Sequence, residues 1–375
     1  MTDLLFLTPI LPCPTGHGGA MRASVLVDVL AERHRVFVAN TGLWGRQGVE
    51  EEWVRSRAAG CASLPAQPDE AALNRLLKEQ FHGAKFEALY VYYLGVANVA
   101  VQLQTMLGTP RPRAVLDLVD NDVERAERFI ALREQIGDSQ EAAVEKAALS
   151  RLQVYLKVFL PRFDTVVLCS ERERDAMAKS YPHKEFVYVP NVVRPAAPAA
   201  LPRDPARLMF VGTLDYLPNE DGVSYFCESV LPLLRESGHR CKVRIIGSGG
   251  KARVQALAGL PDVELTGFVR DLAPEFAQAG MLICPLRAGS GTRLKILEAI
   301  SHECPVVSTH IGAEGLGLVH EQHCLLADSP AEFAEACRRM MTDGALRARL
   351  VANASEWFQT THSVEQVRSA LRDVV

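Results

Sequence analysis

The sequence has 375 residues, of which 48% are hydrophobic, and a formal net charge of −4. This length is long for one hydrophobic core and sufficient for two domains. The slightly acidic balance gives no general attraction to nucleic acid, and no apolar run approaches the roughly 18 residues of a membrane-spanning helix. The nine cysteines are scattered without a C-x-x-C pair, which argues against a zinc or redox centre and favours a reducing cytosol.

The first elements predict a β-α-β unit. An apolar segment at residues 4–8 predicts a buried strand, and it is not a signal peptide because Asp3 precedes it and prolines follow. A loop rich in proline and glycine covers residues 9–19, and apolar residues at helical spacing follow at 25–30. The apolar run at 35–39 predicts the next strand.

A glycine cluster, Gly16-His17-Gly18-Gly19, lies between this first strand and first helix. Glycine lets a backbone approach a ligand closely, so the cluster is a candidate ligand loop. A turn without ligand contact is the alternative, and a lone glycine loop does not decide between the two.

Polar residues follow an apolar strand predicted at 114–119, after another strand at 88–94. Because open α/β sheets bind ligands at the carboxyl ends of their strands, Asp120 and Asn121 are the candidate site residues of the first half. The alternative is that Asp120 or Asp122 caps the helix that follows. The sequence leaves both possibilities open.

The rest of the chain alternates between strand and helix. Strands predicted at 165–169 and 186–190 close the first half, and the Pro- and Ala-rich stretch at 192–206 predicts a linker. Apolar runs predict the strands of the second half at 208–211, 242–246, 263–266, 281–285 and 305–309, before a helical tail at 331–375. This alternation predicts parallel sheets with right-handed crossovers.

The clearest site signal is the strand, glycine loop and helix at residues 281–299. Gly289 and Gly291 permit close approach of the backbone to a ligand. A helix beginning near Thr292 offers its N-terminal N–H groups and the positive end of its dipole to a phosphate.

Charged side chains strengthen this signal. Arg293 and Lys295 add two positive charges beside the loop, and Glu298 lies where a carboxylate can accept hydrogen bonds from ribose hydroxyls. By spacing alone, an ordinary β-α turn with a solvated basic pair is an equal alternative.

The same stretch resembles a known enzyme family. The run G-S-G-T-R-L-K-I-L-E-A at 289–299, with H-E-C-P-V-V-S-T at 302–309 and G-A-E-G-L at 312–316, resembles the donor site of retaining GT-B glycosyltransferases. It is most similar to family 4 enzymes of the bacterial exopolysaccharide type. The resemblance extends to F-V-G-T-L-D-Y-L-P-N at 210–219 and to Gly18-Gly19.

This resemblance implies an α/β protein of GT-B architecture, in which two Rossmann-like domains face each other across a cleft. The acceptor domain would cover residues 1–191, the linker 192–206 and the nucleotide-sugar donor domain 207–352. Residues 353–375 would form a helix that crosses back to the first domain.

The resemblance also implies roles for individual residues. Together with the strand-end position of Asp120 and Asn121, it makes Asp120, Asn121, Arg293 and Lys295 the expected catalytic residues, and His17, Gly18 and Asp120 the expected acceptor-binding residues. The expected donor-binding residues are Gly19, Gly212, Thr213, Gly247, Ser248, Gly249, Val269, Ser290, Gly291, Thr292, Arg293, Leu294, Lys295 and Glu298.

Two departures from the family pattern affect these expectations. The family's donor signature has two glutamates with seven residues between them; Glu298 matches the second, but Ser290 occupies the first position. Ser290 and the loop N–H groups are therefore expected to take over the sugar contacts. The family also often has an arginine and a lysine in the loop at 212–219, where this chain has neither. Arg293 and Lys295 are the expected substitutes for binding the diphosphate.

The expected activity is transfer of a sugar from a nucleotide-diphosphate donor to a glycan, lipid-linked glycan or small molecule, with retention. The run Asp120-Asn121-Asp122 has D-x-D spacing but is better explained as the end of a strand, and no cluster of histidines and carboxylates with metal-ligand spacing is visible, so neither a metal nor a cofactor is expected. A cytoplasmic protein, with or without peripheral contact at the inner membrane face, is expected.

The identity of the donor sugar, the base of the nucleotide and the oligomeric state stay open. A non-hydrolysing sugar-nucleotide epimerase and an inactive GT-B partner subunit are the alternatives. A dehydrogenase is disfavoured because no G-x-G-x-x-G follows the first strand.

Overall fold

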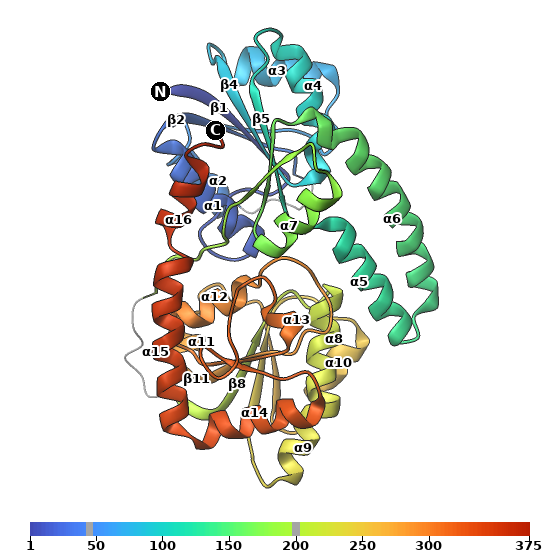
Figure 1. Cartoon of the computed structure of the whole chain (residues 1–375), viewed down its shortest axis with the longest axis vertical. Coiled ribbons are helices and arrows are strands. Elements are labelled where there is room, and N and C mark those ends of the chain that lie inside the picture. Colours follow the sequence, from blue (N-terminus) through green and yellow to red (C-terminus); the bar gives the residue numbers. More distant parts are fainter. Residues whose placement is uncertain (43–47, 197–202) are drawn as a thin grey trace. The chain divides into compact units, whose positions relative to one another are not determined.

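The computed structural model describes residues 1–42, 48–196 and 203–375. The chain forms two compact units, each built on a parallel sheet (Figure 1). The first unit comprises Met1–Val123, Ala147–Val192 and Val364–Val375, and the second comprises Glu124–Lys146 and Val193–Ser363.

The first unit has a seven-stranded parallel sheet with strand order β3-β2-β1-β4-β5-β6-β7. Alternate residues of β1 enter two separate hydrophobic cores: Leu4 and Phe6 lie in one, Leu5 and Leu7 in the other. Both faces of the sheet are therefore covered, as a parallel sheet requires. The strands are β1 Thr2–Thr8, β2 His34–Asn40, β3 Gly60–Ser63, β4 Phe86–Tyr92, β5 Arg113–Val119, β6 Thr165–Leu168 and β7 Glu185–Tyr188.

The helices of this unit begin at residues that suit helix starts. Ser170 and Asp69 each accept a hydrogen bond from a backbone N–H of the first turn that follows. The helices are α1 Gly18–Ala31, α2 Gly48–Arg55, α3 Glu70–Arg75, α4 Ala97–Leu107, α7 Glu171–Ser180 and α16 Val364–Leu371. Two further helices, α5 Asp122–Gln135 and α6 Ser139–Phe159, begin in one unit and end in the other.

The second unit has a six-stranded parallel sheet with order β10-β9-β8-β11-β12-β13. The strands are β8 Asp204–Val211, β9 Lys242–Ile246, β10 Val263–Gly267, β11 Ala279–Cys284, β12 Val306–Ser308 and β13 Leu325–Leu326. The helices are α8 Leu217–Tyr225, α9 Leu231–Glu236, α10 Ala252–Ala256, α11 Ala273–Gln278, α12 Leu294–Ser301, α13 His310–Ala313, α14 Pro330–Thr342 and α15 Gly344–Thr361. Ser329 and Glu332 form a reciprocal capping box at the start of α14.

The predicted α/β class and the parallel sheets are confirmed, and the predicted strands fall on observed ones. The short strands β3 and β13 were missed, β3 because it consists of Gly, Cys, Ala and Ser, without the β-branched or aromatic residues typical of strands, and β13 because it has only two residues. The sequence division also kept residues 124–146 in the first domain, whereas these residues pack within the second unit. They do so because Phe129 and Leu132, on α5, pack in one apolar cluster with Leu217.

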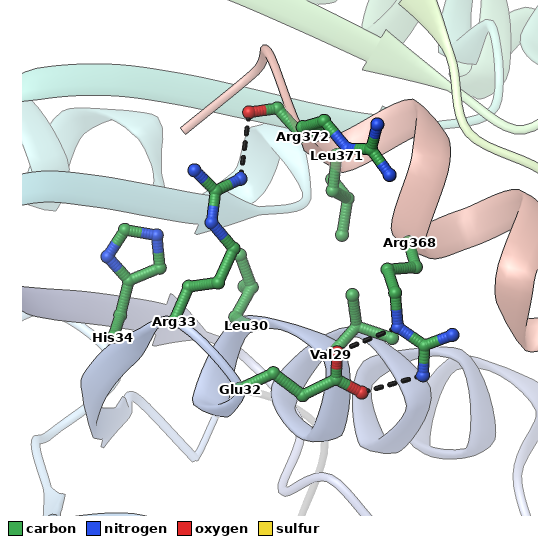
Figure 2. Close-up of a pocket in the computed structure, with 8 residues that line it drawn as sticks. All are labelled: Val29, Leu30, Glu32, Arg33, His34, Arg368, Leu371 and Arg372. Carbon is green, nitrogen blue, oxygen red and sulfur yellow. Dashed lines mark hydrogen bonds and ion pairs between the residues drawn. The ribbon is translucent and has the colours of Figure 1, made fainter. Parts of the chain in front are cut away.

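The last helix of the chain, α16, belongs to the first unit and packs on α1. Arg368 makes a two-point ion pair with Glu32, at 2.7 and 2.8 Å, and Arg33 donates to the carbonyl oxygen of Arg372 at 3.0 Å (Figure 2). A cavity of about 230 Å³ remains between these side chains, with Val29, Leu30 and Leu371 on its apolar side. The contact explains how the end of the chain is held on the first sheet's helical layer.

Candidate functional site

The strand order of the second unit marks one place where a ligand crevice is expected. From β8, the chain proceeds to β9 and β10 on one side and later to β11 on the other. In open α/β sheets, ligands bind at such a reversal of strand order, here at the carboxyl ends of β8 and β11. The loops that begin at Gly212 and at Pro285 follow these two strands, so the sequence-predicted glycine loop lies at this switch point.

The loop between β11 and α12 needs glycine at two positions. Gly289 has a φ of 126° and Gly291 a φ of 68°, a region that other residues rarely adopt. A Cβ on Gly289 would also lie 2.8 Å from a terminal nitrogen of Arg293. The loop conformation and the position of Arg293 therefore depend on each other.

Arg293 is buried and hydrogen-bonds to the protein's own backbone. One terminal nitrogen donates to the carbonyl oxygens of Ser290 and Gly291, the latter at 2.8 Å, and the other donates to Ile311 at 3.2 Å. The helix starts two residues later than expected, with Arg293 as its N-cap residue. In this structure Arg293 braces the loop, and the forked phosphate contact expected from the sequence stays a prediction.

Lys295 lies where the two loops of the switch point meet. Its ammonium group donates to Asn219 Oδ1 at 2.8 Å and lies 4.1 Å from the ring centroid of Phe210. A Cβ added to Gly212 would lie 2.9 Å from the same nitrogen. Burial lowers the pKa of Lys295 to about 8, and the neighbouring Arg293 contributes in the same direction.

Glu298, one turn further along α12, is partly buried. Burial raises the pKa of its carboxyl group to about 7, with an opposing contribution from Lys295. Burial thus shifts the pKa values of two groups of opposite charge, on the same face of α12, toward neutral pH. Such perturbed groups are typical of functional sites.

The loops after β8 and β9 touch backbone to backbone. A Cβ on Gly247 would lie 1.9 Å from the carbonyl oxygen of Gly212, and one on Gly249 would lie 2.0 Å from a carboxylate oxygen of Asp215. Leu214 donates its N–H to the carbonyl oxygen of Ser248 at 2.8 Å. These glycines are therefore required by the packing of the two loops, whether or not a ligand is present. Thr213 and Ser248 are exposed beside them.

Ser290 has an unusual environment. Its side chain is 6% exposed, and its Oγ has no hydrogen-bond partner within the residues that the structure describes. A buried hydroxyl without a partner costs about 1–3 kcal/mol, so natural proteins rarely retain one without reason. Ser290 occupies the position at which the resembling family has its first glutamate. Val269, by contrast, follows the edge strand β10 and is separated from β8 by β9.

Arg128, on α5, was not among the predicted site residues. Its guanidinium donates to the carbonyl oxygen of Gly289 at 2.7 Å and forms ion pairs with Glu314 and with Glu124, the latter at 2.5 Å. The sequence around it is charged and helical, which is also typical of a solvated helix. Only the presence of Glu314 in the motif at 312–316 hinted that a partner was needed.

The first unit has its own switch point, between β1 and β4. His17 is the N-cap of α1, where its Nδ1 accepts a hydrogen bond from the N–H of Gly19 at 3.0 Å. A Cβ on Gly19 would lie 2.8 Å from the hydroxyl of Tyr93, and Tyr92 donates to the carbonyl oxygen of Gly19 at 2.8 Å. The glycine cluster is thus packed against the end of β4, with Gly18 as the first residue of α1.

Asp120 and Asn121 lie at the carboxyl end of β5, as predicted. The thiol of Cys169 donates to Asp120 at 3.5 Å, and the backbone N–H of Asn121 donates to Glu173 at 3.3 Å. Burial raises the pKa of Tyr93, and the nearby charge of Asp120 contributes to this shift. Asp120 and the glycine cluster therefore lie at the same edge of the first sheet.

A buried ion pair supports this edge of the first sheet, and no local sequence pattern indicates it. Arg22, on α1, donates to Asp117 at 3.0 Å and to Asn191 at 2.9 Å, and Tyr90 donates to the same carboxylate at 2.8 Å. The side chain of Arg22 is 2% exposed and that of Asp117 is fully buried. A paired and hydrogen-bonded buried charge of this kind holds α1, β5 and the end of β7 in fixed positions.

Comparisons with known proteins agree with this geometry. Residues 205–343 match the family model described as "Glycosyl transferases group 1". The chain is similar over its whole length to solved structures that share this architecture. The fold is GT-B.

Three of these structures cover nearly all of both chains. HepE of Anabaena, solved in complex with UDP and glucose, has a TM-score of 0.71 and 15% identity, covering 98% of each chain. Sucrose-phosphate synthase of Thermosynechococcus elongatus has a TM-score of 0.69 and 17% identity, covering 98% of this chain and 96% of that chain. The apo structure of OtsA has a TM-score of 0.70 and 14% identity, covering 100% and 99%.

Two relatives are similar in sequence. "Glycosyltransferase 1 domain-containing protein 1" of Xenopus tropicalis is 33% identical over 85 residues, which are 23% of this chain and 25% of that protein. An "uncharacterized 44.6 kDa protein in cps region" of Klebsiella pneumoniae is 24% identical over 221 residues, 56% of this chain and 55% of that protein. The matches thus span about half the length of these relatives or less.

The part of the chain that the structure describes has neither a candidate membrane span nor a candidate metal centre. None of the helices in residues 1–42, 48–196 and 203–375 combines the length and apolar character that a bilayer crossing requires. Within the same residues, no group of three or more histidine, cysteine, aspartate or glutamate side chains is arranged to hold a metal ion.

Proposed function

We propose that the protein is a glycosyltransferase that moves a sugar from a nucleotide-diphosphate donor to an acceptor. The observation that carries this proposal is the position of Lys295 and of the loop at 289–293 at the switch point of the second sheet. The match of residues 205–343 to group 1 glycosyltransferases supports it. The donor would lie on the second unit, and the acceptor would lie at the edge of the first sheet that carries His17, Gly18 and Asp120.

The reaction needs a group that stabilises the negative charge developing on the leaving diphosphate. Lys295 supplies a positive charge at low dielectric, and the N-terminal N–H groups and dipole of α12 favour an anion at the same place. Arg293 contributes by holding the loop carbonyls, so that the backbone N–H groups between Gly289 and Thr292 are oriented. We propose that no metal ion is needed, because these groups can supply the charge that a metal would.

Two side chains would bind the sugar and the nucleoside. When the donor binds, the buried Ser290 hydroxyl would form a hydrogen bond to the donor sugar. It would thereby replace the family's first glutamate. Glu298 would accept hydrogen bonds from the ribose hydroxyls. Retention of configuration and membership of family 4 are part of the proposal and rest on the resemblance at 289–299.

The donor and acceptor are proposed by class. The Anabaena structure contains UDP and glucose, so UDP-glucose is the first donor to test. The Klebsiella relative comes from a cps region, which supports a glycan or lipid-linked glycan as the acceptor and an exopolysaccharide setting. Contact with a membrane surface would follow if the acceptor is lipid-linked.

Incubation with a panel of nucleotide sugars, each with and without glycan and lipid-linked acceptors, tests the proposal. We expect nucleotide release that depends on the acceptor and that persists in EDTA. The matched control is Lys295→Met, which keeps most of the side-chain volume but removes the charge. An isomerised donor would instead indicate an epimerase, and donor binding without turnover a non-catalytic subunit. Either result, or loss of activity in EDTA that magnesium restores, would overturn the corresponding part of the proposal.

A further inference from the structure

The outer face of α6 exposes apolar side chains that nothing within the described residues covers. Val154 is 62% exposed and Val158 is 53% exposed, and their i, i+4 spacing puts them on one stripe of the helix. Leu156, on the opposite side, is buried in the core of the first unit. The helix therefore has one apolar stripe that packs and another that does not.

This outer face is held rigidly on the first unit. The hydroxyl of Tyr155 accepts a hydrogen bond from the backbone N–H of Asn98 at 3.3 Å, and its ring lies 4.3 Å from that of Phe159. Beside the valines is a shallow surface hollow of about 450 Å³, lined by Ser150, Arg151, Val154, Tyr155, Val158 and Phe159. An apolar surface that is both exposed and fixed in place is typical of a docking site.

The charges around this face have one sign. Residues 147–163 contain no aspartate or glutamate, although the whole chain has a net charge of −4. Arg151 and Lys157, both exposed, flank the two valines, and Arg162 follows at the end of the helix. The surface that carries the exposed valines is therefore locally cationic.

We propose that Val154 and Val158, together with Arg151 and Lys157, form a surface that docks on an anionic lipid bilayer. Valine side chains at this depth can enter the boundary between headgroups and acyl chains, while the arginine and lysine pair with lipid phosphates. A second copy of the chain fits less well, because a twofold contact through this face would place Arg151 and Lys157 near their own equivalents. This inference does not depend on the proposed activity.

Co-sedimentation of the whole protein with lipid vesicles tests the inference. We expect binding to mixed phosphatidylcholine–phosphatidylglycerol vesicles, little binding to phosphatidylcholine alone, and weaker binding as salt is raised. The double variants Val154→Ser/Val158→Ser and Arg151→Gln/Lys157→Gln should each weaken binding by roughly tenfold, since each removes one of the two contributions. Circular dichroism should show that both variants remain folded, because all four side chains are exposed.

Matched controls come from the other unit. Val319, which is 49% exposed, and Lys251, whose side chain is 59% exposed, are changed to serine and glutamine, and both variants should bind vesicles like the wild type. Absence of wild-type binding, or equal binding by wild type and Val154→Ser/Val158→Ser, would overturn the inference. So would a dimer in sedimentation without vesicles that the same double variant abolishes, since the face would then be an interface between copies.

Discussion

Arg128 donates a hydrogen bond to the carbonyl oxygen of Gly289 at 2.7 Å, although 161 residues separate them in the sequence. Arg128 also pairs with Glu314, on the far side of the same loop. Two arginines therefore hold carbonyl oxygens of the loop at 289–293: Arg293, which is part of the loop, and Arg128, which lies on α5. A carbonyl fixed in this way also fixes the peptide N–H that follows it, which belongs to the group proposed to bind the diphosphate.

Replacing Arg128 should therefore weaken donor binding without removing any proposed donor contact. We expect Arg128→Ala to lower the affinity for a nucleoside diphosphate by ten- to a hundredfold, since hydrogen bonds to charged groups contribute about 1.5–3 kcal/mol. Arg128→Lys should rescue binding in part, because one charged donor remains. Calorimetric titration with UDP measures the effect.

The control for Arg128 lies on the same helix. Arg133 pairs with Asp138 and Glu145, away from the loop, so Arg133→Ala removes comparable ion pairs without touching Gly289. If Arg128→Ala and Arg133→Ala bind UDP equally well, the contact between α5 and the loop has no part in donor binding.

The contrast between Lys295 and Arg128 shows what the sequence could predict. The sequence predicted the strand, glycine loop and helix that carry Lys295, because local residue patterns determine these elements, whereas the strand order that makes the loop a switch point came from the structure. Contacts that join distant segments, such as Arg128 to Gly289 or Arg22 to Asp117, leave no local pattern. The motif also predicted that Arg293 binds the diphosphate, which stays a prediction; the contacts of its guanidinium with the carbonyl oxygens of Gly291 and Ile311 came only from the structure.

Ser290→Ala separates a structural role from a functional one. If the hydroxyl had only a structural role, removing a buried group without a partner would leave function unchanged and make the fold equally or more stable. We expect an unchanged or raised melting temperature together with a kcat/KM about tenfold lower, as the loss of one hydrogen bond to the donor sugar predicts. Wild-type kcat/KM in this variant would contradict the assignment of Ser290 to the donor sugar.

Glu298→Gln should weaken nucleoside-diphosphate binding by roughly 1.5–3 kcal/mol, or ten- to a hundredfold, because the ribose hydroxyls lose a charged hydrogen-bond acceptor.

The change Glu298→Gln should also stabilise the unliganded protein above pH 7. Because the pKa of Glu298 is raised to about 7, its contribution to folding is present below its ordinary pKa and is lost as the pH rises through 7. Thermal unfolding at pH 5.5 and 8 measures this difference. Equal UDP affinity in variant and wild type would refute the ribose contact.

The depressed pKa of Lys295, about 8, gives donor binding a specific pH dependence. Below pH 8 the ammonium group is charged and available to a diphosphate. Above it, binding must first add a proton, so affinity should fall by about tenfold for each pH unit until the pKa of the complex is reached. Calorimetry at pH 9 in two buffers of different ionisation enthalpy should detect uptake of a proton on UDP binding.

Lys295→Met should bind UDP weakly and without this proton uptake, whereas Lys251→Gln, a change of an exposed lysine, should behave like the wild type. Equal affinity of the wild type at pH 7 and pH 9.5 would show that the ammonium group of Lys295 does not contact the diphosphate.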